Sequence, residues 1–255
     1  GKKIADGILN GLKHKIKNLR QKPGLALVLV GNNPASEIYV NFKEKTCKEN
    51  GFYCERFNLD NDPGELDLLK LVNELNQRTD IHGILVQLPL PKHINEHLIV
   101  ESILPHKDVD GFTPVNLGNL VCDNTILVPA TARAVLHLIE STGIEIKGKN
   151  SVIVGRSNIV GKPTAMLLLG KDATVTICHS KTMNLAEHTK QADILVVAVG
   201  KPRLITKDMV KEGAIVIDVG INKINDRIVG DVDFENVKNV FGYITPVPGG
   251  VVPMT

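Results

Sequence analysis

The sequence predicts an α/β protein with two domains, each built around a parallel sheet. Short apolar runs of strand length, such as 25-LALVLV-30 and 194-ILVVAV-199, alternate with segments whose apolar residues recur at helical spacing. Strands that are separated by helices form parallel sheets with helices on both faces. A chain of 255 residues is also long enough for two separate cores. We expect one domain over residues 1–129 and another over 130–255, with a cleft between them.

The first half of the chain opens on a predicted helix. An apolar stripe at helical spacing precedes the run 25-LALVLVG-31, which has the length of a buried strand. The stripe consists of Ile4, Ile8, Leu12 and Ile16. The alternation continues with helix 35–49, strand 52–59, helix 63–77, strand 83–88 and helix 93–103.

The second half resumes the alternation after a break. Proline and glycine cluster between Pro105 and Gly118, where we expect the chain to leave the first layer. Helix 132–142 is the expected crossover into the second sheet. The later elements are strand 151–155, a helix from Gly161, strand 173–178, helix 184–190 and strands 193–199 and 214–220.

Composition narrows the class of partner. The net charge is +2, with 30 basic and 28 acidic residues, so nothing favours a nucleic acid or a membrane surface, and a small-molecule ligand is expected. The longest apolar runs are too short to cross a bilayer. The four cysteines form no C-x-x-C pair, which predicts reduced, buried thiols and no disulfide framework or zinc site. Such thiols favour a reducing compartment. We expect the cytoplasm, with an organelle matrix as the open alternative.

The segment 151-SVIVGRSNIVGKP-163 has the pattern of a buried strand, a tight glycine turn and a helix start. Such a turn directs helix amides at an anion, so Gly155 and Gly161 are candidate phosphate-binding positions in a Rossmann-like domain. The spacing differs from G-x-G-x-x-G, and Pro163 stands where a Walker A loop needs Ser or Thr. An ordinary strand-to-helix turn is the alternative.

The next strand favours NADP over NAD. Sites for NAD place an Asp or Glu at the end of the second strand, about 20 residues beyond the glycines, whereas 173-ATVTIC-178 is followed by 179-HSKT-182. The missing carboxylate and the cluster of donors at 179–182 suit a 2′-phosphate, on which Arg156 could close with charge-assisted hydrogen bonds. Further along, Gly200 in 199-VGKP-202 and Ile221 in 219-VGIN-222 follow strands where the nicotinamide half would lie, although plain loops fit these segments equally well.

A second group of candidates lies in the first half. Tyr39 and Lys43 are four residues apart on a predicted helix, hence on one face, although a solvated helix face would have the same spacing. Gln87 ends the apolar strand 83–88, at the edge of the sheet where ligands gather. Because a buried amide needs a hydrogen-bond partner, a lysine in the same cleft would serve.

Three other segments complete the candidate list. Within 107-KDVDGF-112, Asp110 is a candidate site residue, although an aspartate in so turn-rich a segment can also serve only to form a turn. Asp108 is expected to be the turn-forming residue of the two, but the sequence alone does not decide between them. The proline- and glycine-rich segment 245-TPVPGGVVPMT-255 is expected to form the wall of a pocket. The run 93-HINEH-97 fits H-x-x-E-H, but no third ligand accompanies it, so we expect a surface helix and no metal site.

Together these stretches resemble the bifunctional methylenetetrahydrofolate dehydrogenase/cyclohydrolase family, over nearly the whole chain. The segments that carry the resemblance are 30-VGNNPASEIYVNFKEK-45, 85-LVQLPLP-91, 107-KDVDGFTPVNLGNL-120, 154-VGRSNIVGKP-163, 178-CHSKT-182 and 244-ITPVPGGVVPMT-255. The resemblance implies an NADP-dependent enzyme of one-carbon metabolism, which supports purine biosynthesis, and a homodimer paired through the cofactor domain. Val252 departs from the family motif, which has glycine there, beside the expected folate cleft.

The resemblance also implies roles for single residues. Tyr39 would stack on the folate, Lys43 would transfer protons, Gln87 would tune Lys43, and Asp110 would anchor the pterin ring. Arg156, Ser157 and Ser180 would contact NADP. The folate cleft would be completed by Pro248, Gly249 and Gly250.

Two alternatives remain open at this point. Another NADP-dependent dehydrogenase, for example one that acts on a shikimate-like hydroxy acid, could use a similar two-domain frame. A catalytically silent nucleotide sensor could also retain the glycine turn. A hydroxy-acid dehydrogenase should offer clustered basic or hydroxyl groups in place of Tyr39, Gln87 and Asp110. The presence of both Lys43 and Gln87 argues against a silent sensor.

Overall fold

The computed structural model describes residues 1–59, 63–225, 227–238 and 242–255. The chain forms two compact units. The first unit comprises Asp6–Asn119 and Thr125–Leu127, and the second comprises Gly1–Ala5, Leu120–Asn124 and Val128–Thr255. The predicted α/β class with two parallel-sheet domains is confirmed, whereas a functional division after residue 129 stays a prediction. None of the described helices is long and apolar enough to cross a membrane.

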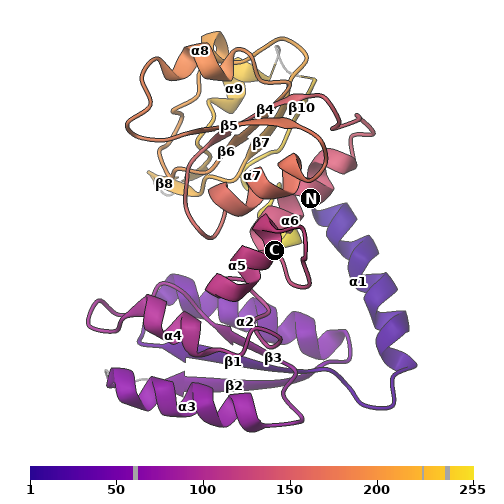
Figure 1. Ribbon diagram of the computed structural model, residues 1–255, viewed down its shortest axis with the longest axis vertical. Coiled ribbons are helices and arrows are strands. Elements are labelled where there is room, and N and C mark those ends of the chain that lie inside the picture. The colour runs from indigo at the N-terminus through magenta and orange to yellow at the C-terminus, as the bar shows by residue number, and fades with distance from the viewer. Residues whose placement is uncertain (60–62, 226, 239–241) are drawn as a thin grey trace. The chain divides into compact units, whose positions relative to one another are not determined.

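The first unit is built on three parallel strands in the order β2-β1-β3. These are β1 (Gly24–Val30), β2 (Tyr53–Leu59) and β3 (Gly83–Val86). Helix α2 (Pro34–Glu49) covers one face, and α3 (Glu65–Gln77) with α4 (Glu96–Ser102) covers the other (Figure 1). Because alternate residues of a strand point to opposite faces, β1 supplies Leu27 and Leu29 to the α2 side and Val28 to the α3 side.

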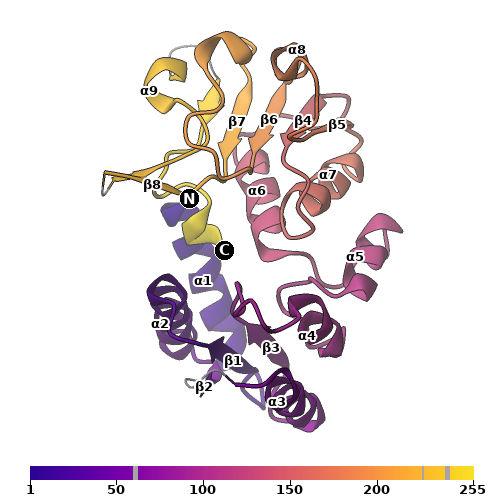
Figure 2. The same ribbon diagram turned by 90° about the vertical axis from the view of Figure 1, so that its left-hand side faces the viewer.

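The second unit contains a five-stranded sheet in the order β10-β7-β6-β4-β5, whose strand pairs are all parallel. The strands are β4 (Asn150–Val154), β5 (Thr174–Cys178), β6 (Ile194–Val197), β7 (Ile215–Asp218) and β10 (Tyr243–Ile244). Helices α6 (Ala130–Glu140) and α7 (Gly161–Leu169) pack on one face. The other face carries α8 (Leu185–Thr189) and α9 (Phe234–Val237), as Figure 2 shows.

The remaining elements are shorter or terminal. They are α1 (Lys2–Lys17), α5 (Pro114–Val121), the antiparallel pair β8 (Asn222–Ile224) and β9 (Arg227–Val229), and two short 3₁₀ helices, η1 (Lys207–Met209) and η2 (Val252–Met254). The hairpin, the 3₁₀ helices, α5, α9 and β10 were absent from the predicted elements. All are short or interrupted, so they carry little periodicity.

Two predictions from sequence were wrong in detail. Helix α4 begins at Glu96, because the Asn95 side chain accepts the amides of His97 and Leu98 and so caps the helix there. His93 lies before the cap, so 93-HINEH-97 is not one surface helix. The expectation of buried thiols also fails at Cys122, which is exposed, while Cys178 is buried and Cys47 and Cys54 are half-buried.

Candidate active site

A contact between Lys43 and Gln87 lies at the centre of the first unit's candidate site. Lys43 is half-buried on α2, and its Nζ donates a hydrogen bond to Gln87 Oε1 at 3.1 Å. Gln87 directly follows β3, and its backbone N–H still donates to Val28 of β1 at 2.9 Å. Its Nε2 donates to the Leu88 carbonyl at 2.8 Å. The amide is therefore held from both ends, with its oxygen directed at the lysine.

Tyr39 lies one turn before Lys43 on α2, as the four-residue spacing predicts. Its side chain is 39% exposed, so a ring face remains available to a ligand. Ile38 and Phe42 on the same helix are also exposed. The helix thus presents aromatic and apolar surface beside the lysine, which suits a flat aromatic ligand.

Asp110 belongs to the same group. Burial raises the pKa of its carboxyl group, the positive charge of Lys43 lowers it, and the negative charge of Asp108 raises it further. Asp110 is thus near enough to Lys43 for their charges to interact, and the net effect favours the neutral acid more than in water. Lys43, Gln87 and Asp110, which come from α2, the end of β3 and the 107–112 segment, lie together in the first unit.

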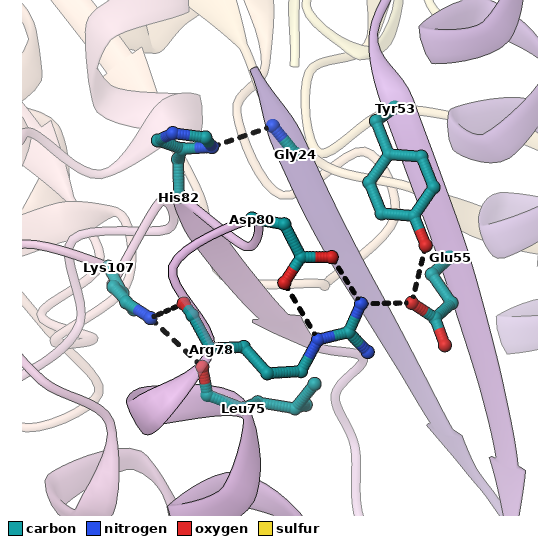
Figure 3. Close-up of polar contacts among 8 residues, drawn as sticks. All are labelled: Gly24, Tyr53, Glu55, Leu75, Arg78, Asp80, His82 and Lys107. Atoms are coloured by element: carbon teal, nitrogen blue, oxygen red, sulfur yellow. Dashed lines mark hydrogen bonds and ion pairs between the residues drawn. The ribbon is translucent and has the colours of Figure 1, made fainter. Parts of the chain in front are cut away.

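The segment that carries Asp110 is anchored by Lys107, a residue that the sequence analysis did not single out. Lys107 is buried, and its Nζ donates to the carbonyls of Leu75 and Arg78 at 2.9 and 2.7 Å (Figure 3). It also donates to the Asn76 carbonyl at 2.8 Å. These carbonyls end α3, where a cation also suits the helix dipole. Burial lowers the pKa of Lys107. Only the fold reveals this role, because the three acceptors lie about 30 residues earlier in the chain.

Asp108 completes the anchoring. A turn begins at this residue, as expected, because its backbone carbonyl accepts the Gly111 N–H at 3.1 Å. Its Oδ2 accepts hydrogen bonds from the backbone N–H of Thr113 at 2.8 Å and from Asn116 Nδ2 at 2.9 Å. Asp108 is 2% exposed, so its carboxylate is committed to these partners. Asp110 is left as the carboxylate of this segment with no comparable structural task in the hydrogen bonds of the described residues.

The opposite end of the same strands carries a structural ion cluster. Arg78 binds both carboxylate oxygens of Asp80, at 3.0 and 2.6 Å, and contacts Glu55 at 2.7 Å (Figure 3). Tyr53 donates to the same Glu55 at 2.8 Å. These residues lie at the amino ends of β2 and β3, whereas Gln87 follows the carboxyl end of β3. We assign the cluster a role in joining the strands, apart from the candidate site.

In the second unit, the predicted glycine turn lies between β4 and α7. Gly155 has a φ of +130°, and a Cβ there would lie 2.3 Å from the Ala198 carbonyl oxygen. A Cβ at Gly161 would lie 2.2 Å from the Gly155 carbonyl oxygen. Only glycine fits this tight approach of strand, turn and helix, which is the local geometry of a phosphate-binding turn. Ser157 Oγ accepts the amides of Val160 and Gly161 and shapes the start of the helix.

The candidate phosphate contacts share one edge of the sheet. In the parallel pairing, Val154 of β4 is the partner of Cys178 of β5, and Arg156 and Ser180 each lie two residues beyond. Both are exposed, and no carboxylate follows β5. The loop after β5 is held by its own side chains, with the His179 amide donating to Thr182 Oγ1 at 2.8 Å. These residues fit a phosphate on the adenosine ribose.

Gly200 and Ile221 follow β6 and β7, so they lie at the same edge of the sheet as the glycine turn. Both are exposed, and Gly200 has a φ of +64°. The segment with Pro248, Gly249 and Gly250 belongs to the second unit, where it leads to Val251 in the core between α6 and the sheet. A Cβ at Gly250 would lie 2.5 Å from the Pro246 carbonyl oxygen, so this turn is closely packed. Val252 is 39% exposed.

A five-stranded parallel sheet with a glycine turn at the start of a helix defines the second unit as a Rossmann-like nucleotide-binding domain. It shares one chain with an α/β unit that holds the Lys43, Gln87 and Asp110 group. The fold and the site therefore define the protein as a nucleotide-dependent enzyme with two α/β domains. Among the described residues, no group of three or more His, Cys, Asp and Glu side chains could hold a metal ion.

Comparison with known proteins identifies the family. Residues 1–110 match the model of the tetrahydrofolate dehydrogenase/cyclohydrolase catalytic domain, and residues 129–255 match the model of the NAD(P)-binding domain of the same family. The chain is 54% identical to the bifunctional protein FolD of Moorella thermoacetica, over 100% of this chain and 92% of that protein. The chain belongs to the tetrahydrofolate dehydrogenase/cyclohydrolase family.

Solved structures agree with this assignment. The structure of the bifunctional enzyme FolD from Campylobacter jejuni matches 99% of this chain and 92% of that chain, with a TM-score of 0.97 and 48% identity. The Trypanosoma brucei enzyme, solved with NADP and an inhibitor, matches 100% and 91% with a TM-score of 0.94 and 38% identity. The family resemblance inferred from the motifs is thus confirmed, and the two alternative functions are not favoured.

Proposed function

We propose that this protein oxidises 5,10-methylenetetrahydrofolate to the 5,10-methenyl form with NADP⁺ and hydrolyses the methenyl form to 10-formyltetrahydrofolate. The family assignment supports both activities. The observation that carries the proposal within this chain is the hydrogen bond from Lys43 to Gln87, in a group that includes Asp110. A silent sensor would have no use for a lysine whose amine is held in place beside an aspartate.

The hydrolytic step needs proton transfer. Water adds to the methenyl carbon and loses a proton, and the ring nitrogen that leaves this carbon gains one. Lys43 is the group that moves these protons. Gln87 holds Nζ of Lys43 at 3.1 Å, and the Leu88 carbonyl fixes the amide that does so. The pair therefore supports the cyclohydrolase activity.

The dehydrogenase step needs mainly positioning. The carbon that loses hydride lies between two nitrogens, whose lone pairs stabilise the resulting cation, so no strong acid or base is required. NADP⁺, when bound, accepts the hydride. Tyr39 stacks on the folate, and Asp110 binds the pterin ring, for which a raised pKa suits a hydrogen-bonding carboxyl group. Pro248, Gly249 and Gly250 line the folate site.

NADP is the cofactor. Arg156 and Ser180 bind the 2′-phosphate, and Gly155, Ser157 and Gly161 bring the helix start close to the phosphates. The absence of a carboxylate after β5 supports this choice, because an acidic side chain there would repel a 2′-phosphate. The nicotinamide half lies against the loops of Gly200 and Ile221.

We further propose a cytoplasmic homodimer. The cytoplasm suits four free cysteines, which stay reduced there. Pairing through the second unit is supported by the exposed Ile224 and Ile228 on its β8–β9 hairpin. Sedimentation analysis of the wild type tests the dimer, and a monomer at micromolar concentration contradicts it.

One assay tests the main proposal. Purified protein with methylenetetrahydrofolate and NADP⁺ should form NADPH, followed by its absorbance. Methenyltetrahydrofolate without nucleotide should lose its own absorbance faster than in buffer. If the first reaction does not occur, the proposed dehydrogenase activity is contradicted. If the second does not occur, the proposed cyclohydrolase activity is contradicted.

A further inference from the structure

Two carboxylates in the second unit are buried next to each other and take no part in the site described above. Asp218 ends β7 and is 4% exposed, while Asp231 lies just after β9 and is 0% exposed. The backbone N–H of Asp231 donates to Asp218 Oδ1 at 2.9 Å. In the part of the chain that the structure describes, both are held by hydrogen-bond donors, without an ion pair to a basic side chain. Burying a carboxylate costs free energy unless its oxygens are hydrogen-bonded, so two buried carboxylates side by side call for a functional explanation.

Asp231 joins two loops at the carboxyl ends of neighbouring strands. Its Oδ2 accepts the backbone N–H groups of Val199 and Gly200, at 2.7 and 3.0 Å, in the loop that follows β6. Its Oδ1 accepts a hydrogen bond from Asn222 Nδ2 at 2.9 Å, and Asn222 is the first residue of β8, directly after the loop that follows β7. These are the two loops proposed above to carry the nicotinamide half of the cofactor. One carboxylate therefore sets their spacing.

Asp218 holds Asp231 in place through the backbone of Asp231. Its carboxylate accepts the N–H groups of Gly220 and Val232 at 2.9 Å, in addition to that of Asp231. Its own backbone N–H donates to Thr245 Oγ1 at 2.8 Å. The ends of β7 and β9 and the start of the 245–255 segment are thus tied into one network.

The backbone packs directly on both carboxylates. A Cβ at Gly220 would lie 2.3 Å from Asp231 Cγ, and a Cβ at Gly230 would lie 1.8 Å from Asp218 Oδ2. Glycine at these two positions is therefore required by the close approach of the carboxylates, and not by a positive φ. The arrangement leaves little room for either carboxylate to move.

We propose that Asp231 is a positioning residue for the nicotinamide half of NADP, acting through the Val199–Gly200 amides and Asn222. The inference rests on the proposed NADP-dependent dehydrogenase activity and extends it. Asp231 touches no reacting atom. It fixes the two loops that are proposed to bind the nicotinamide half. The adenosine half, which is assigned to Arg156 and Ser180, and the hydrolytic reaction at Lys43 do not depend on it.

The hydrogen-bond pattern defines a substitution that tests the contact between Asp231 and Asn222 directly. In Asp231→Asn, one oxygen can still accept the Val199 and Gly200 amides, but the new NH₂ group then faces the NH₂ group of Asn222. The Asn222 amide is held in this orientation because its Nδ2 also donates to the Val229 carbonyl at 3.4 Å. The double variant Asp231→Asn/Asn222→Asp restores a donor and an acceptor at this contact and keeps the net charge. Asp233→Asn is the matched control, because Asp233 is half-buried and its Oδ2 accepts a hydrogen bond from Asn236 Nδ2 at 2.7 Å.

Binding is measured with two probes, NADP⁺ and 2′,5′-ADP, which lacks the nicotinamide half. We expect Asp231→Asn to lower the affinity for NADP⁺ by about tenfold, which corresponds to the loss of one charge-assisted hydrogen bond. Binding of 2′,5′-ADP should stay within about twofold of wild type, and so should both ligands in the control. The double variant should recover most of the NADP⁺ affinity. The inference is overturned if Asp231→Asn weakens the binding of both ligands equally or leaves NADP⁺ binding unchanged. It is also overturned if the double variant does not recover NADP⁺ affinity.

Activity gives an independent readout. Asp231→Asn should lower dehydrogenase kcat/KM for NADP⁺ by about tenfold or more while hydrolysis of methenyltetrahydrofolate stays within about twofold. A merely structural role would lower both activities together. If the wild type lacks dehydrogenase activity, the proposed function fails, and the two binding probes still test the placement of Asp231. Should Asp231→Asn not fold, Asn222→Leu removes the donor to Oδ1 and is expected to weaken NADP⁺ selectively in the same comparison.

Discussion

Lys43 Nζ on α2 lies 3.1 Å from Gln87 Oε1, although the two residues are 44 positions apart in the chain. The contact joins a helix that follows β1 to the residue that follows β3. The Gln87 amide cannot turn its NH₂ group toward the lysine, because Nε2 already donates to the Leu88 carbonyl. The relationship is therefore directional, and it places a lysine amine where a ligand on α2 would meet it.

Replacement of the lysine tests its role in hydrolysis. Lys43→Met should lower cyclohydrolase turnover by at least about 100-fold, because proton transfer is lost, while NADP⁺ still binds. Stopped-flow loss of methenyltetrahydrofolate and an NADP⁺ titration measure the two quantities. Lys45→Met, two residues along the same helix and exposed, is the control and should behave as the wild type. Wild-type hydrolysis by Lys43→Met would contradict the assignment.

Arg156 should discriminate between the two nicotinamide cofactors. Arg156→Ala removes a guanidinium that binds the 2′-phosphate, so NADP⁺ affinity should fall by about tenfold or more while NAD⁺ affinity changes little. Calorimetric titration with each cofactor measures both. Lys171→Ala, two residues beyond the end of α7, serves as a control for loss of a positive charge. Equal losses for the two cofactors mean that Arg156 does not bind the 2′-phosphate.

Asp218 should make stability depend on pH. Burial raises its pKa from 3.8 to about 6, with Asp231 adding to the rise and three backbone amides opposing it. Because the folded-state pKa is the higher one, the group stabilises the fold fully below about pH 4, and this contribution is lost as pH rises through about 6. The expected loss is on the order of 3 kcal/mol of unfolding free energy.

Asp218→Asn removes this titration, so its unfolding free energy should change less between pH 4 and 7 than that of the wild type, whatever its absolute stability. Urea unfolding followed by circular dichroism across this range gives the comparison. Asp172→Asn, in which an exposed carboxylate is replaced, should keep the wild-type slope. Parallel curves for wild type and Asp218→Asn would contradict the prediction.

Lys107 should contribute to stability more than a surface lysine. Lys107→Met leaves the Leu75, Asn76 and Arg78 carbonyls without their buried donor, and we expect a loss of about 2 to 4 kcal/mol in unfolding free energy. Thermal or urea unfolding measures it, with the exposed Lys92→Met as control. A loss no larger than that of the control would show that water replaces the lysine at α3 without cost.

Local patterns in the sequence were sufficient for several parts of the site. The spacing of Tyr39 and Lys43 predicted one helix face, the apolar run before Gln87 predicted a buried strand end, and the residues around Gly155 predicted a tight strand-to-helix turn. Each of these depends on neighbours within a few residues, where backbone geometry is periodic. The helix start at Glu96 was missed because Asn95 acts as a cap inside a pattern that continues upstream.

The sequence by itself determined the alternation of strands and helices, the parallel α/β class and the identity of the motifs that mark the family. The tertiary structure alone decided which distant groups meet. It paired Lys43 with Gln87, committed Lys107 to the end of α3, and placed Asp231 between two loops. A charged residue in a sequence looks the same whether it faces water or a set of buried amides. Its role depends on partners that the chain brings together only when the sheets form.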